Sequence, residues 1–209
     1  MDIVIKRLLA GDQINGMDID DTFIVESILV LSLIDGQIGY TVKEISSYKK
    51  SYKEEQPMGD SDGASLLTYI DNPDRIMYLA TVENQAIGRI SLKRNWNNYA
   101  YIEDIAVDKH NRRYGVGRQL IREAKRWAEA GGMAGIMLET QNNNVQACKF
   151  YERCGFMIGG FDAQLYKGID AGSDEIAIFW YLMLDKLESE QSHLAMKLTL
   201  PVKFSFSNS

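Results

Sequence analysis

The chain has 209 residues, of which 45% are hydrophobic and 25% charged, and its formal net charge at pH 7 is -6. This length favours one large domain with a sizeable core, and the composition is typical of a soluble globular protein. A net negative chain does not offer the basic face that nucleic-acid and anionic-membrane binders need, so neither is an expected partner.

The N-terminal residues and the two cysteines indicate in which cellular compartment the protein is expected. Asp2, Lys6 and Arg7 interrupt the apolar run that a secretory signal would need. The longest apolar stretch is too short to span a bilayer. Cys148 and Cys154 lie close together within a helical pattern, which argues against a disulfide framework. A cytoplasmic protein is therefore expected.

The first half of the chain is predicted to consist mainly of strands. The first three candidates, the last two of which flank the turn Asp35-Gly36, cover residues 3–8, 23–34 and 37–45. Residues 46–62 are polar and are expected to be a loop that carries a short helix. Residues 64–70 are predicted to be helical, and the turn residues 71–74 end that helix.

A run of three antiparallel strands follows, bounded by turn residues, at 75–82, 86–93 and 99–107. Residues 116–128 place apolar side chains on one helical face, and Gly131-Gly132 ends that helix. Residues 135–140 form a short apolar strand. Because a helix connects them, the strands at 99–107 and 135–140 are expected to be parallel.

The last predicted elements are a helix and two strands. Asn143 or Asn144 is placed to cap the helix, and Gly155 ends it. Residues 156–168 and 175–184 are predicted as the closing strands.

These elements are expected to form a single domain over residues 1–185. The sequence indicates no role for the C-terminal tail, residues 186–209.

A glycine-rich loop lies between a predicted strand and a predicted helix. It reads Arg112-Arg113-Tyr114-Gly115-Val116-Gly117 and is followed by Arg118. The glycines let a ligand approach the backbone, and the N-terminus of the following helix favours an anion. The arginines supply positive charge for a diphosphate or a 3'-phosphate. In isolation the pattern is more often that of a glycine-rich turn with solvated arginines.

Two other phosphate-binding loops fit less well. A P-loop requires Gly-Lys-Ser/Thr, but Gly117 precedes Arg118 and Gln119. A dinucleotide fingerprint requires a third glycine where this chain has Leu120.

The context of the loop resembles the GNAT acetyltransferase superfamily. The strand at 101–107, the R-x-x-G-x-G loop and the later Asn144-x-x-Ala147-x-x-x-Tyr151 with Gly155-Phe156 occur in that family's order and spacing. The resemblance implies an α/β (α+β) fold: a mixed, mainly antiparallel sheet flanked by helices, with a V-shaped splay between two central parallel strands. It implies acetyl-CoA as co-substrate and no metal. The residues expected to bind acetyl-CoA are Ile105, Ala106, Val107, Arg112, Arg113, Tyr114, Gly115, Val116, Gly117, Arg118 and Asn144.

Acetyl transfer to an amine requires a base that removes the amine proton. Glu103 is the candidate base and a candidate substrate ligand, because strand alternation places it on the same face as Ile105 and Val107. Asp104 falls on the opposite face, but a bulge in the strand would turn it toward a substrate ammonium. A solvated strand carboxylate is the alternative for Glu103.

Tyr151 is the candidate general acid for the departing thiolate, the alternative being a core aromatic residue on an amphipathic helix. Neither cysteine is needed as a nucleophile, so direct transfer is expected.

Several stretches resemble the streptothricin acetyltransferase branch of the family, among them residues 95–107, 137–141, 147–151 and 175–182. This resemblance implies acetylation of the β-lysine amine of a cationic antibiotic, with Glu103, Asp104 and Glu139 as substrate-binding residues. A polyamine or protein amine acetyltransferase, and a non-catalytic acyl-CoA sensor, stay open as alternatives. A homodimer also stays open.

Overall fold

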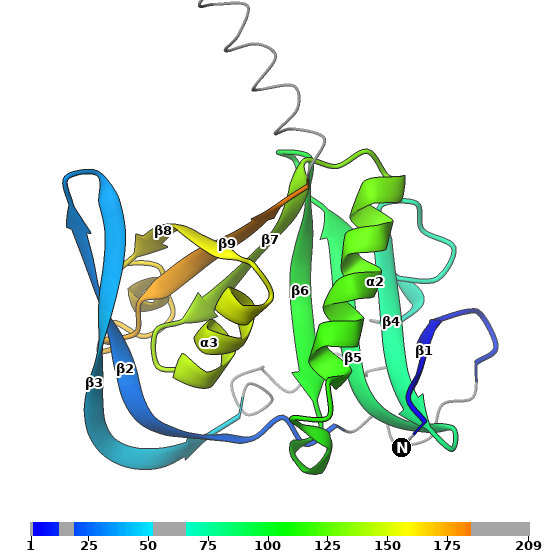
Figure 1. Cartoon of the computed structure of the whole chain (residues 1–209), viewed down its shortest axis with the longest axis horizontal. Coiled ribbons are helices and arrows are strands. Elements are labelled where there is room, and N and C mark those ends of the chain that lie inside the picture. Colours follow the sequence, from blue (N-terminus) through cyan, green and yellow to red (C-terminus); the bar gives the residue numbers. More distant parts are fainter. Residues whose placement is uncertain (1, 13–18, 52–65, 185–209) are drawn as a thin grey trace, which may run out of the picture.

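The computed structural model describes residues 2–12, 19–51 and 66–184. A seven-stranded sheet forms its centre (Figure 1). In spatial order the strands are β1 (Val4–Arg7), β4 (Arg75–Val82), β5 (Gln85–Arg94), β6 (Tyr99–Val107), β7 (Gly135–Gln141), β9 (Ala177–Met183) and β8 (Met157–Asp162). Neighbouring strands are antiparallel except for β6 and β7, which are parallel. The predicted mixed, mainly antiparallel sheet is thus confirmed.

The two parallel strands diverge along their length. They pair at Tyr99–Gly135, Ala100–Ile136 and Tyr101–Met137, and then separate toward their carboxyl ends. Figure 1 shows the resulting V between β6 and β7. This confirms the predicted splay, which leaves strand backbone available to a ligand in the middle of the sheet.

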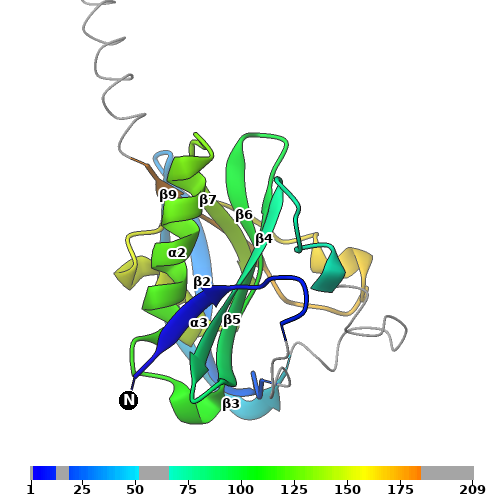
Figure 2. The same ribbon diagram turned by 90° about the vertical axis from the view of Figure 1, so that its right-hand side faces the viewer.

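Two helices cover one face of the sheet. The helix α2 (Val116–Ala130) buries its apolar side, and α3 (Val145–Arg153) packs beside β7 and β9 through Cys148 and Tyr151. Both helices share one core with sheet residues such as Ile90 and Trp180. Segments 66–74 and 163–176 lie on the opposite side from α2 (Figure 2).

A two-stranded sheet of β2 (Phe23–Ile34) and β3 (Gln37–Lys50) stands beside α3 (Figure 1). It is attached at Leu29, which is fully buried. The Leu29 N–H donates to the Asn142 carbonyl at 2.9 Å, and the Asn142 side-chain amide donates back to the Leu29 carbonyl at 3.1 Å. These two bonds fix β2 against the junction of β7 and α3.

The structure differs from the predicted elements at three places. Residues 46–50 belong to β3, because they pair with the start of β2 and this long-range pairing outweighs their polar composition. The strand predicted over 156–168 stops at Asp162, whose carboxylate accepts the Gln164 N–H at 2.7 Å and turns the chain into the 3-10 helix η2 (Tyr166–Gly168). Of the helix predicted at 64–70, only 66–67 are helical among the described residues.

The remaining predicted elements are confirmed within a residue or two. The predicted tail at 186–209, and most of the predicted loop at 46–62, lie outside the described residues. Within the described ranges, no helix is long and apolar enough to cross a membrane.

Candidate active site

A β-bulge in β6 determines which side chains reach the splay. Ser91 of β5 is opposite Asp104, but the next residue, Leu92, is opposite Ile102, so Glu103 is the extra residue. Because cross-strand partners share a face, Ile105 lies on the α2 side with its partner Ile90.

The bulge overturns the simple alternation expected for this strand. Glu103 does not share a face with Ile105, whereas Asp104 lies on the face opposite Ile105, where simple alternation also places it. The sequence gives no signal for the bulge. Nothing in the composition of the strand indicates whether Glu103 is opposite a residue of β5 or is the extra residue of a bulge.

The glycine-rich loop joins β6 to α2 through the 3-10 helix η1 (Lys109–Asn111). Gly115 is the N-cap of α2 with φ of 84°, a left-handed conformation that favours glycine. Gly117 is needed for space, since a Cβ there would lie 3.0 Å from Phe150 Cζ. Gly115 has no side chain that could accept a hydrogen bond from the first turn. The backbone N–H groups of that turn can therefore donate to a bound anion.

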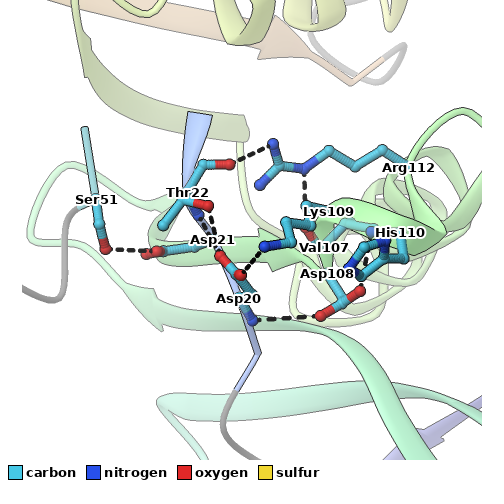
Figure 3. Close-up of polar contacts among 9 residues, drawn as sticks. All are labelled: Asp20, Asp21, Thr22, Ser51, Val107, Asp108, Lys109, His110 and Arg112. Atoms are coloured by element: carbon cyan, nitrogen blue, oxygen red, sulfur yellow. Dashed lines mark hydrogen bonds and ion pairs between the residues drawn. The ribbon is translucent and has the colours of Figure 1, made fainter. Parts of the chain in front are cut away.

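Arg112 anchors the loop by binding main-chain carbonyls (Figure 3). Its Nε donates to the Val107 carbonyl at 3.0 Å, and its Nη1 donates to the Thr22 carbonyl at 2.8 Å. Nearby, Lys109 Nζ lies 2.6 Å from the Asp20 carboxylate and holds the pKa of Asp20 well below its usual range. These contacts fix the loop, and Arg112 also lines the neighbouring cleft, so its contact with phosphate stays a prediction.

A cleft of about 870 Å³ runs from this loop to the splay. Among the residues predicted to bind acetyl-CoA, those that line it are Ile105, Ala106, Val107, Arg112, Arg113, Gly115, Val116, Gly117, Arg118 and Asn144. Tyr114 does not line the cleft and is 65% exposed. The opposite wall includes Phe23, Ile24 and Ser27 of β2. Sequence reasoning missed this wall, because its residues lie about ninety positions from the loop and match no local motif.

The N-terminal end of α3 forms another wall of the cleft. Asn144 caps α3, its side chain accepting the Ala147 N–H at 3.1 Å. Tyr151 lines the cleft and is only 6% exposed, with its ring 5.4 Å from Phe150 and 6.1 Å from Trp180 between centroids. Tyr151 is therefore both a core aromatic residue and part of the cleft wall.

The carboxylates of β6 have different surroundings. Glu103 accepts from Tyr69, Arg75 and Lys93, each at 3.0 Å, and does not line the cleft. Asp104 lines the cleft and pairs with Arg89 Nε at 2.7 Å. Asp104 is thus the carboxylate nearer to the expected position of the cofactor.

Glu139 of β7 lies on the side of the sheet opposite the helices. Burial raises its pKa, against a hydrogen bond that Tyr166 donates to it and with a further upward contribution from the charge of Glu175. Burial also raises the pKa of Tyr101, as do the nearby carboxylates Glu139 and Glu103. Glu139 and Glu103 therefore act on the same region of this face.

Both cysteines are free thiols. Cys148 is 1% exposed, and burial raises its pKa to about 12. The thiolate form is accordingly scarce at neutral pH, which agrees with direct transfer and not with a Cys148 nucleophile.

Comparisons with known proteins agree with this geometry. A model of the acetyltransferase (GNAT) family matches residues 44–156. Streptothricin acetyltransferase A of Bacillus subtilis is 39% identical over 163 residues, which cover 78% of this chain and 89% of that protein. Streptothricin acetyltransferase of Escherichia coli is 36% identical, covering 79% and 87% respectively.

A solved structure from Bacillus anthracis, in complex with acetyl coenzyme A, is 54% identical. It superposes with a TM-score of 0.77 and covers 88% of this chain and 98% of its own.

Proposed function

The chain belongs to the GNAT acetyltransferase family, and we propose that its acceptor is a cationic small molecule, streptothricin, acetylated at the β-lysine amine. The chain is an acetyl-CoA-dependent N-acetyltransferase. The finer proposal is supported by the names of the two relatives and by the carboxylates on the face opposite α2, since these favour a cationic acceptor.

One observation carries the proposal: Asp104 lines the same cleft as the glycine-rich loop. In the proposed complex, the diphosphate of acetyl-CoA binds at Gly115–Gly117 and the positive end of α2. The pantetheine then follows residues 105–107 of β6, and the thioester lies at the splay. Backbone N–H groups freed by the separation of β6 and β7 stabilise the oxyanion.

The amine must be neutral to attack the thioester. An alkylamine has a pKa of about 10.4, so only a small fraction is neutral at pH 7 without a base. The bulge carries two carboxylates that can accept the proton, directly or through water. We assign the base to Asp104 because it lines the cleft, whereas Glu103 is held by three partners. Glu103 then sets the charge and position of the groups around the acceptor.

Tyr151 is proposed to protonate the departing thiolate, since it lines the cleft on the α3 side. A thiol of pKa about 8.5 is a good leaving group, so this protonation supplies a modest part of the rate.

The release of CoA thiol tests the proposed function. Purified protein is given acetyl-CoA with streptothricin, spermidine or a lysine peptide, and thiol is followed with time. Fast release with streptothricin, and acetylation mapped to its β-lysine by mass spectrometry, is the expected result. Release with spermidine or the peptide alone refutes the antibiotic assignment, and binding of acetyl-CoA without release to any amine refutes catalysis.

A further inference from the structure

At the end of β7, two side-chain amide oxygens are buried without a hydrogen-bond partner among the described residues. They are Gln141 Oε1 and Asn143 Oδ1, and these residues are only 5% and 4% exposed. Most buried polar atoms in folded proteins are paired, and an unpaired acceptor loses its hydration without compensation. Each oxygen is therefore expected to accept a hydrogen bond from a bound ligand or water.

The nitrogen of Asn143 fixes the orientation of its amide. Nδ2 donates to Glu175 Oε1 at 2.8 Å and to the Tyr48 hydroxyl at 3.1 Å. Turning the amide over would set Oδ1 against the Glu175 carboxylate, an acceptor against an acceptor. The oxygen is consequently the atom left for a ligand, and Asn143 lines the same cleft as Asp104.

The charged groups around Asn143 are mainly acidic. Glu175 Oε1 also accepts from Lys50 Nζ at 2.5 Å, and Glu139 lies close enough to be affected by the charge of Glu175. Lys50 pairs with Glu175, whereas Glu139 accepts a hydrogen bond from the neutral Tyr166 hydroxyl. The cluster thus holds two carboxyls and one lysine, a composition that favours a cationic donor.

Gln141 extends this cluster along β7. Ile136 and Leu138 lie in the core with the helices, so strand alternation places Glu139 and Gln141 together on the other face. The two unpaired amide oxygens thus accompany two carboxylates at one end of β7.

We propose that Asn143 is a specificity-determining residue: its Oδ1 accepts a hydrogen bond from a charged N–H of the acceptor, at a nitrogen other than the one that is acetylated. The reacting nitrogen must lose its proton, whereas an acidic cluster stabilises the protonated form of an amine. The cluster therefore suits a second cationic group, and the ligand class is an amine with at least two basic nitrogens. This inference rests on the proposed amine acetylation.

The test compares wild-type protein with Asn143→Leu, which removes the oxygen at similar size. The steady-state KM for streptothricin, or for whichever diamine the wild type acetylates, should rise about tenfold or more. The value of kcat should change less than threefold, and calorimetry should give an acetyl-CoA Kd within twofold. The exposed amide of Gln85, the first residue of β5, provides the matched control: Gln85→Leu should leave every constant unchanged.

Two results overturn the inference. An unchanged diamine KM in a folded Asn143→Leu protein shows that Oδ1 does not contact the acceptor. Equal weakening of acetyl-CoA binding and of the amine KM shows that the oxygen accepts from an amide of the cofactor instead. Wild-type protein that acetylates no amine overturns both proposals, so the two failures are distinguishable.

A second variant covers the case in which Asn143→Leu does not fold. Glu175→Gln keeps an oxygen for Asn143 Nδ2 and for Lys50 Nζ but removes the negative charge. It should raise the diamine KM and weaken its dependence on salt. A KM and a salt dependence equal to those of the wild type contradict the proposal.

Discussion

Replacing Asp104 with Asn is the sharpest test of the proposed mechanism. At pH 7, about one alkylamine in a few thousand is neutral, and a general base contributes about 10²–10⁴-fold to such a rate. We therefore expect Asp104→Asn to lower kcat/KM about 100-fold or more at pH 7. Near pH 10 the amine deprotonates in solution, and the deficit should shrink to about tenfold or less.

The Asp104→Asn protein should be almost as stable as the wild type, so unfolding should contribute little to its lower kcat/KM. The Asp104 side chain is 42% exposed and pairs with Arg89, so the ion pair is worth at most about 1 kcal/mol. Urea unfolding should show a similarly small change.

Glu103→Gln is the matched control. It leaves Arg75 and Lys93 without their carboxylate and should lower the rate by a factor that does not vary with pH. Stopped-time thiol assays from pH 6 to pH 10 on both variants give the answer. A pH-independent loss in Asp104→Asn, with a pH-dependent one in Glu103→Gln, would refute our assignment and make Glu103 the base.

Three further changes test the loop, the thiol and the buried carboxyl. Gly117→Ala places a methyl group 3.0 Å from the Phe150 ring and should weaken acetyl-CoA binding about tenfold by calorimetry. Gly115→Ala meets no neighbour and should instead lower the free energy of unfolding by about 1–2 kcal/mol, because its φ is left-handed. If both variants lose binding and stability equally, the two glycines do not have these separate roles. Cys148→Ala should keep kcat within twofold, because the thiol is protonated at neutral pH; a loss of a hundredfold would indicate a covalent acetyl intermediate. Because the pKa of Glu139 is raised in the folded state, the folded protein binds that proton more tightly, and wild-type stability should fall as pH rises from the ordinary value of 4.5 through the raised pKa. Glu139→Gln should remove that slope in urea titrations, and parallel pH profiles for the two proteins would disprove the assignment.

Local signals were enough to predict most of the fold. Hydrophobic periodicity and glycine positions predicted α2 and the parallel pair β6–β7, and Asn144 marked the start of α3. Sequence reasoning failed where long-range pairing decides structure. The polar end of β3 is a strand because it pairs with β2, and β8 lies beyond β9 at the sheet edge although it precedes β9 in the chain.

The cofactor side of the site was more predictable than the acceptor side. The loop at 112–117 depends on a contiguous motif, and its glycines are required by backbone conformation and by the Phe150 contact. The choice between Glu103 and Asp104 depends on the bulge, which arises from pairing with β5 and leaves no sequence pattern. The sequence marks Asn143 only as a candidate helix cap, because its partners Tyr48 and Glu175 come from distant segments.

Because β2 forms one wall of the cleft, the segment of the chain needed for activity is longer than the segment that carries the family motifs. The family model begins at residue 44, yet Phe23, Ile24 and Ser27 line the cleft and the Thr22 carbonyl holds Arg112. A protein trimmed to the matched region would keep every motif residue and lose one side of the cofactor cleft. Transplanting the acetyltransferase motifs into another chain therefore requires the N-terminal hairpin as well.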